Sequence, residues 1–108
     1  MMNKDAMIAQ FSNLTPADQI IMLLRVCFNL TIVTRDILAS GSQNKVEYAS
    51  NMSEMHHKIF PGIISRLTQT GSRYPDDVLV GMLHGFIIQF NLEPHGHFIW
   101  DDALRKLK

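Results

Sequence analysis

The sequence predicts an all-α protein, folded as a compact up-and-down bundle of four to five main helices. Apolar residues recur at helical spacing along the whole chain, and no segment alternates between apolar and polar residues as a half-buried strand would. Capping residues, prolines and glycines divide these segments at short intervals. Short connections favour antiparallel neighbours. A length of 108 residues predicts one helical domain, residues 1–108, in which residues 1–12 form a peripheral leading helix.

The first half of the chain carries clear start and stop signals. A short helix is expected around Asn3–Phe11. Thr15 is a favourable N-cap, and Pro16 suits the first position of the helix that follows. The apolar pattern then continues to Ala39, where Gly41 provides a stop.

A middle helix is predicted to open near Ser42–Asn44 and to run to Ile59, where Pro61 and Gly62 break or kink it. Residues 63–70 continue as a short helix that ends at Gly71. Projection of the middle helix, up to Ile59, gives it an apolar face and a polar face. The apolar face comprises Tyr48, Met52, Met55 and Ile59, and the polar face comprises Glu47, Asn51, Glu54 and Lys58.

The last third contains two more helices. Residues 74–77, Tyr-Pro-Asp-Asp, form a start signal for a helix that reaches about Asn91. Residues 93–96 are predicted to be a loop. A final helix is expected over His97–Leu107, with acidic residues near its start and basic residues at its end, as the helix dipole favours.

Two segments, Ile20–Val33 and Val78–Leu92, are apolar on nearly every side of a helix. A helix of that kind must be covered all round, which is difficult in so small a chain. We therefore expect a homodimer. Gly81 and Gly85, four residues apart, would let another helix approach closely. The residues expected at the interface or in close packing are Leu24, Phe28, Gly81, Gly85, Ile88 and Leu92.

Few polar residues interrupt these segments. Asp18, Arg25, Asn29 and Asp36 form one narrow stripe on the first, and His84 stands alone on the second. A buried imidazole needs hydrogen-bond partners, so we expect a polar core contact among Arg25, Asn29 and His84. His84 is then either a structural histidine or a pH-responsive residue of the interface. If the stripe faces solvent instead, Val78–Leu92 is the expected dimer surface.

Metal ligation is a weaker hypothesis. Glu54 and His57 have the Glu-x-x-His spacing of di-iron bundles, but such sites need two copies of the motif, and the chain has only three glutamates. His95 and His97 are weak metal candidates, with a third ligand from another histidine. We predict no cofactor. Cys27, the only cysteine, is expected to be an inert core residue.

Charge and motifs narrow the function classes. Ten basic and ten acidic residues give a formal net charge of zero, and no block of like charge suits nucleic acid. The longest apolar run is too short and too polar to span a membrane. No nucleophile or phosphate-binding motif is present. We therefore expect a cytoplasmic, non-enzymatic interaction or regulatory module that homodimerises. The expected partners are a second copy of the chain and, beyond it, another protein; no membrane contact is expected, and the charge pattern disfavours nucleic acid. The alternatives are a metal-binding protein using His95 and His97 and a DNA-associated regulator.

Overall fold

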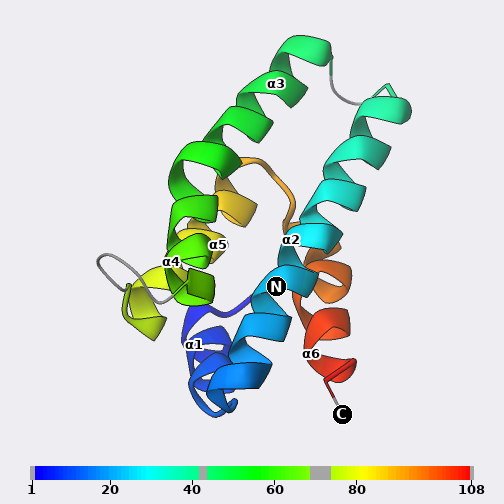
Figure 1. Ribbon diagram of the computed structural model, residues 1–108. Coiled ribbons are helices and arrows are strands. Elements are labelled where there is room, and N and C mark those ends of the chain that lie inside the picture. The colour runs from blue at the N-terminus through cyan, green and yellow to red at the C-terminus, as the bar shows by residue number, and fades with distance from the viewer. Residues whose placement is uncertain (1, 42–43, 69–73, 108) are drawn as a thin grey trace.

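The computed structural model describes residues 2–41, 44–68 and 74–107 (Figure 1). Helices account for nearly all of these residues, and the described part contains no strand. The prediction of an all-α bundle is therefore confirmed. The successive long helical runs point in alternating directions, as an up-and-down arrangement requires (Figure 1).

The first two helices begin and end where the capping signals predict. Helix α1 spans Lys4–Ser12, and the side chain of Asn3 accepts a hydrogen bond from the Ala6 amide at 2.9 Å. Helix α2 spans Pro16–Ala39. The Thr15 hydroxyl caps it by accepting from the Asp18 amide at 3.2 Å. Gly41 follows α2 with a φ of 79°, a conformation that glycine adopts without steric cost.

The middle of the chain stays helical through Pro61 rather than breaking there. Helix α3 (Lys45–Glu54) continues into a π-helical turn, η1 (Met55–Ile59), and then into α4 (Phe60–Thr68). The Phe60 amide donates to the Met55 carbonyl, five residues back. Because Pro61 has no amide hydrogen, the turn before it lacks one donor, and widening that turn accommodates the proline. The predicted end at Thr70 and Gly71 lies outside the described residues.

Helix α5 (Asp76–Gln89) ends two residues before the predicted boundary. The Leu92 amide donates to the Ile87 carbonyl at 2.8 Å, and the Asn91 amide donates to the Ile88 carbonyl at 3.2 Å. Asn91 has a φ of 56°. This is a Schellman motif with asparagine in the position that glycine usually takes.

The segment after α5 is more helical than predicted. A loop was expected over residues 93–96, but Glu93–His95 form a 3₁₀ turn, η2, because Pro94 suits the first turn of a helix. A π-helical segment, η3 (His97–Asp102), and the short α6 (Ala103–Arg105) complete the chain. The predicted final helix is thus present and ends at Arg105.

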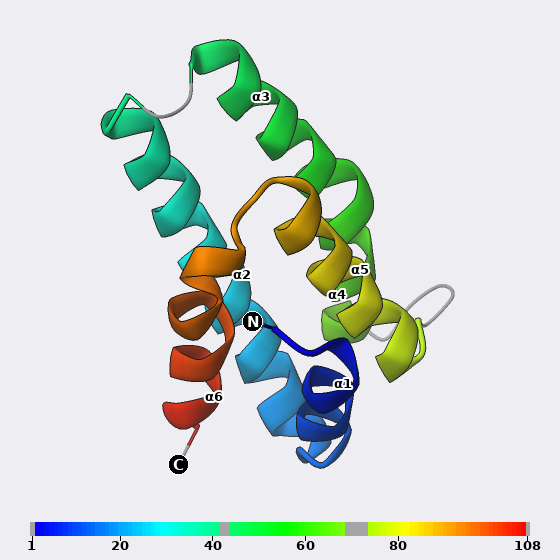
Figure 2. The same ribbon diagram turned by 180° about the vertical axis from the view of Figure 1, so that it is seen from behind.

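The helices enclose one core. Helix α1 packs on α5, the run from α3 to α4 contacts both α2 and α5, and η3 and α6 cover one side of α2 (Figures 1 and 2). Its largest fully buried side chain is Trp100 on η3. The predicted polar face of the middle helix was wrong at Asn51, because this residue is buried and only 2% exposed. It lies four residues before Met55, and residues four apart share a helix face, so the buried line includes it.

Gly62 is expected to be essential to packing. A Cβ atom there would lie 2.6 Å from the Tyr74 ring and 2.9 Å from Leu79 Cδ1. Gly62→Ala should therefore lower the free energy of unfolding by about 1–3 kcal/mol in chemical denaturation, as overpacking typically does. Gly81→Ala is the matched control, since a Cβ atom there meets nothing within 4 Å. Alanine is the better helix former, so this variant should be neutral or stabilising by about 0.5–1 kcal/mol. Equal destabilisation in both variants would contradict the packing described.

Candidate interaction surface

The side of α2 that faces away from the core is apolar. Ile21, Leu24 and Phe28 lie three and four residues apart and so share one face of the helix. Their exposed fractions are 41%, 49% and 66%. We call these three residues the α2 stripe. The core side of the same helix is also apolar, with Met22, Val26, Leu30 and others fully buried. Helix α2 therefore carries apolar surface on opposite sides, and the fold covers only one of them.

A groove lies beside the α2 stripe, where α2 meets η3 and α6. Its volume is about 390 Å³, and its lining combines the apolar side chains of Leu24, Phe28, Ile32 and Phe98 with the charged side chains of Arg25 and Lys106. Lys106 forms an ion pair with Asp102 at 3.1 Å. The groove and the stripe together make a continuous apolar surface along the first part of α2.

Asn29 holds the C-terminal segment against α2. It is 6% exposed, and its side-chain amide donates to the Phe98 carbonyl at 3.0 Å and to the Ile99 carbonyl at 3.4 Å. Arg25 is exposed and His84 is half-buried. No hydrogen bond or ion pair among the described residues joins His84 to Arg25 or Asn29. The structure therefore does not bring these three residues together, and Asn29 of the polar stripe is bonded to η3 rather than to α5.

The glycine face of α5 is open. A Cβ atom at Gly81 or Gly85 would meet nothing within 4 Å, so no described helix lies against them. Ile88 is 42% exposed on the same face, whereas Leu92 is fully buried in the core. A hollow of about 190 Å³ lies beside this face, lined by Met82, Gly85 and Phe86 of α5 and by the paired side chains of Glu54 and Lys58. The part played by the glycines in close packing thus remains a prediction.

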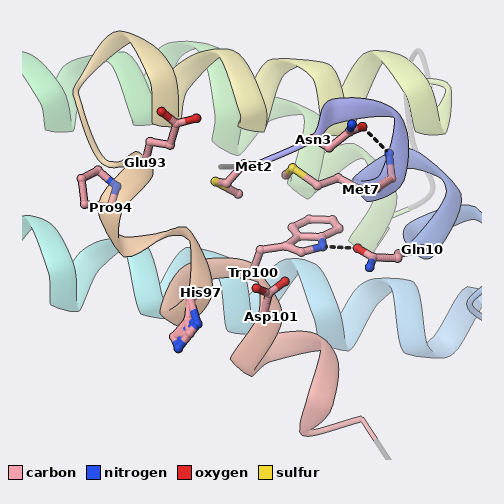
Figure 3. Close-up of a pocket in the computed structure, with 10 residues that line it drawn as sticks. Met2, Asn3, Met7, Gln10, Glu93, Pro94, His97, Trp100 and Asp101 are labelled. Atoms are coloured by element: carbon pink, nitrogen blue, oxygen red, sulfur yellow. Dashed lines mark hydrogen bonds between the residues drawn. The ribbon is translucent and has the colours of Figure 1, made fainter.

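A further hollow lies between α1 and the η2–η3 segment (Figure 3). Its volume is about 510 Å³, and Glu93, His97 and Asp101 line it. Figure 3 shows these three side chains pointing in different directions. Trp100 Nε1 donates to Gln10 Oε1 at 2.8 Å and ties η3 to α1. In the described ranges, no three histidine, cysteine or acidic side chains are placed to hold a metal ion.

The two adjacent histidines of the middle helix each lie within hydrogen-bond distance of a backbone carbonyl one turn earlier. His57 Nδ1 lies 2.7 Å from the Ser53 carbonyl oxygen, and His56 Nδ1 lies 2.8 Å from the Met52 carbonyl oxygen. Glu54 pairs with Lys58 at 3.0 Å. The Glu-x-x-His spacing therefore does not bring its carboxylate and imidazole together.

Cys27 is unsuited to nucleophilic chemistry. Burial raises the pKa of its thiol to about 12, so the thiol stays protonated at neutral pH. Cys27 was expected in the core, but it is half-buried and packs against the core from its border.

Arg66 on α4 stands at the centre of a buried polar network that was not predicted from the sequence. Its side chain is 5% exposed. It donates to Gln19 Oε1 at 3.1 Å and to the Tyr74 carbonyl at 2.9 Å, and it pairs with the Asp76 carboxylate. Gln19 in turn donates to the Phe11 carbonyl at 3.0 Å. The only sequence signal was an arginine close to the apolar residues Ile63, Ile64 and Leu67.

Arg66 also sets the charge state of Asp76. Desolvation raises the pKa of the Asp76 carboxyl, but the hydrogen bond and the positive charge of Arg66 lower it, as do hydrogen bonds from Ser12 and Gln19. The net effect is a pKa below the usual value. The folded protein therefore favours the ionised carboxylate.

Comparison with known protein families, with curated proteins and with solved structures finds no match. Among the described helices, none has the length and apolarity needed to cross a membrane.

Removing the Arg66 charge should be strongly destabilising. Arg66→Met leaves the Asp76 carboxylate, the Gln19 amide oxygen and the Tyr74 carbonyl without their donor. The free energy of unfolding should fall by about 3 kcal/mol or more. Arg35→Met, which removes an exposed arginine from α2, should change it by less than about 0.5 kcal/mol. Similar values for the two variants in urea denaturation would refute a central role for Arg66.

The Asp76 interaction should weaken in acid. Because its pKa is lower in the folded than in the unfolded chain, its contribution is complete above the unfolded value of about 4 and is lost as pH falls through the folded value. The difference in unfolding free energy between the wild type and Asp76→Asn should be constant from about pH 5 to 7 and should narrow below about pH 4. A difference that is unchanged at low pH would argue against this pKa shift.

Proposed function

We propose that this protein is a small cytoplasmic interaction or regulatory module, without enzymatic activity of its own, that works by self-association through the outer face of α2. The observation that carries the proposal is the exposure of Ile21, Leu24 and Phe28 on one side of a helix whose other side is already buried. Monomeric proteins rarely leave a contiguous apolar patch of this kind in water, and such patches often mark interaction sites.

Two further properties support self-association. The formal net charge is zero, so bulk electrostatic repulsion does not oppose the approach of two copies. The groove beside the stripe adds a recess next to a projecting aromatic side chain, Phe28. A projection and a recess on the same face are what a twofold, self-complementary contact uses.

Phe28→Glu should convert an associated protein into a monomer. A glutamate in place of Phe28, the most exposed residue of the stripe, would bury an unpaired charge on association, which is strongly unfavourable. We expect the wild type to be dimeric at micromolar concentration in multi-angle light scattering and the variant to be monomeric with unchanged helix content.

Ile64→Glu is the matched control. Ile64 is 54% exposed on α4 and lies outside the stripe, so this variant should remain dimeric. A wild-type protein that is a monodisperse monomer at micromolar concentration would refute the proposal. Equal loss of association in both variants would place the contact elsewhere.

A further inference from the structure

We infer that two copies of this chain pair their α2 helices antiparallel, with Asp18 of each copy opposite the partner's Arg25. The inference rests on the proposed self-association and specifies its geometry. It follows from three features of α2: the spacing of its outer apolar residues, the difference between the two flanks of the stripe, and the sizes of the residues along it.

The outer face of α2 has the spacing of a coiled-coil seam. Ala17, Ile21, Leu24, Phe28 and Thr31 are separated by four, three, four and three residues, and all five are exposed. This is the alternation of a and d positions that a pairing helix needs, over about two heptads. The occupant that fits such a seam is another helix with the same spacing.

The two flanks of the seam differ in chemistry. Asp18 and Arg25 lie seven residues apart on one flank, and Ile20 and Cys27 lie seven residues apart on the other. The first flank therefore carries one charge of each sign, and the second is apolar and half-buried. Neither Asp18 nor Arg25 forms an ion pair with any other described residue, whereas the neighbouring Lys106 is already paired with Asp102.

This difference between the flanks selects the direction of pairing. In a parallel pair, each flank faces the opposite flank of the partner, so Asp18 and Arg25 would lie against Ile20 and Cys27. Charges would then lose water without gaining a partner. In an antiparallel pair, each flank faces its own counterpart. Asp18 then meets the partner's Arg25 twice across the twofold axis, and the apolar flanks cover each other.

The sizes of the seam residues favour the same direction. When Ile21 lies opposite the partner's Leu24, Ala17 lies opposite the partner's Phe28. The largest side chain of the seam thus meets the smallest, which allows the two backbones to stay evenly spaced. A parallel pair would place Phe28 against Phe28 and Ala17 against Ala17, leaving one end crowded and the other loose.

Charge reversal tests the arrangement. Arg25→Glu alone, or Asp18→Lys alone, should raise the dimer dissociation constant about tenfold at low salt, because two attractive pairs become two repulsive ones. The double variant, Asp18→Lys with Arg25→Glu, should return the constant to within about threefold of the wild type. Lys45→Glu, on exposed α3, makes the same net charge change as Arg25→Glu and should leave the constant unchanged.

The outcomes separate this inference from the proposed function. A monomeric wild type would refute both. Two results would overturn the antiparallel pairing while leaving self-association intact. One is a dissociation constant that the single charge reversals do not change, and the other is a weakened dimer whose affinity the double variant does not restore.

Cross-linking provides a test that does not depend on charge. In a Cys27→Ser background, copies carrying Ala17→Cys should form disulfide-linked dimers only when mixed with copies carrying Phe28→Cys. In parallel pairing, each variant would instead form disulfide-linked homodimers, and the mixture would contain no disulfide between position 17 of one copy and position 28 of the other. That result would contradict the inference.

Discussion

The buried Arg66 guanidinium is the interaction on which the arrangement of helices depends. It stands on α4 and reaches Gln19 on α2, the Tyr74 carbonyl and Asp76 at the start of α5. Gln19 extends the network to the end of α1 through the Phe11 carbonyl. Four helices are thus held at one point by hydrogen bonds that would be costly to leave unmade. This anchor fixes the N-terminal part of α2 and so sets which side of that helix faces outward.

Asn29 fixes the same helix further along. Its side-chain amide holds η3 through the Phe98 and Ile99 carbonyls, ten residues beyond Gln19 on the same helix. These hydrogen bonds, at Gln19 and at Asn29, fix the rotation of α2 about its own axis. In this orientation Ile21, Leu24 and Phe28 are exposed to water. The exposed stripe is therefore a consequence of how the polar contacts orient α2. Rotating the helix to bury Phe28 would break the hydrogen bonds of Gln19 and Asn29.

Local signals in the sequence predicted the helices well because capping is a short-range effect. Thr15, Pro16 and Gly41 act within a few residues, and the structure confirms each of them. The excess of apolar surface on α2 could also be predicted from the sequence, because projecting residues onto a single helix requires no knowledge of the tertiary structure. Other features were missed because they depend on partners distant in the chain. The role of Arg66 requires residues 47 positions away, and the half-buried setting of His84 depends on how α5 sits. A proline can either end a helix or be accommodated by a widened turn, and packing against the rest of the fold determines which occurs at Pro61.

In the proposed dimer, a second copy covers the outer face of α2 and not the glycine face of α5. A dilution series followed by two-dimensional NMR tests it most directly, because resonances at a contact change as the dimer dissociates. The account predicts that the changes on dilution centre on Ile21, Leu24 and Phe28 and leave Gly81, Gly85 and Ile88 unaffected. Changes confined to the α5 residues, or a spectrum that does not depend on concentration, would contradict it.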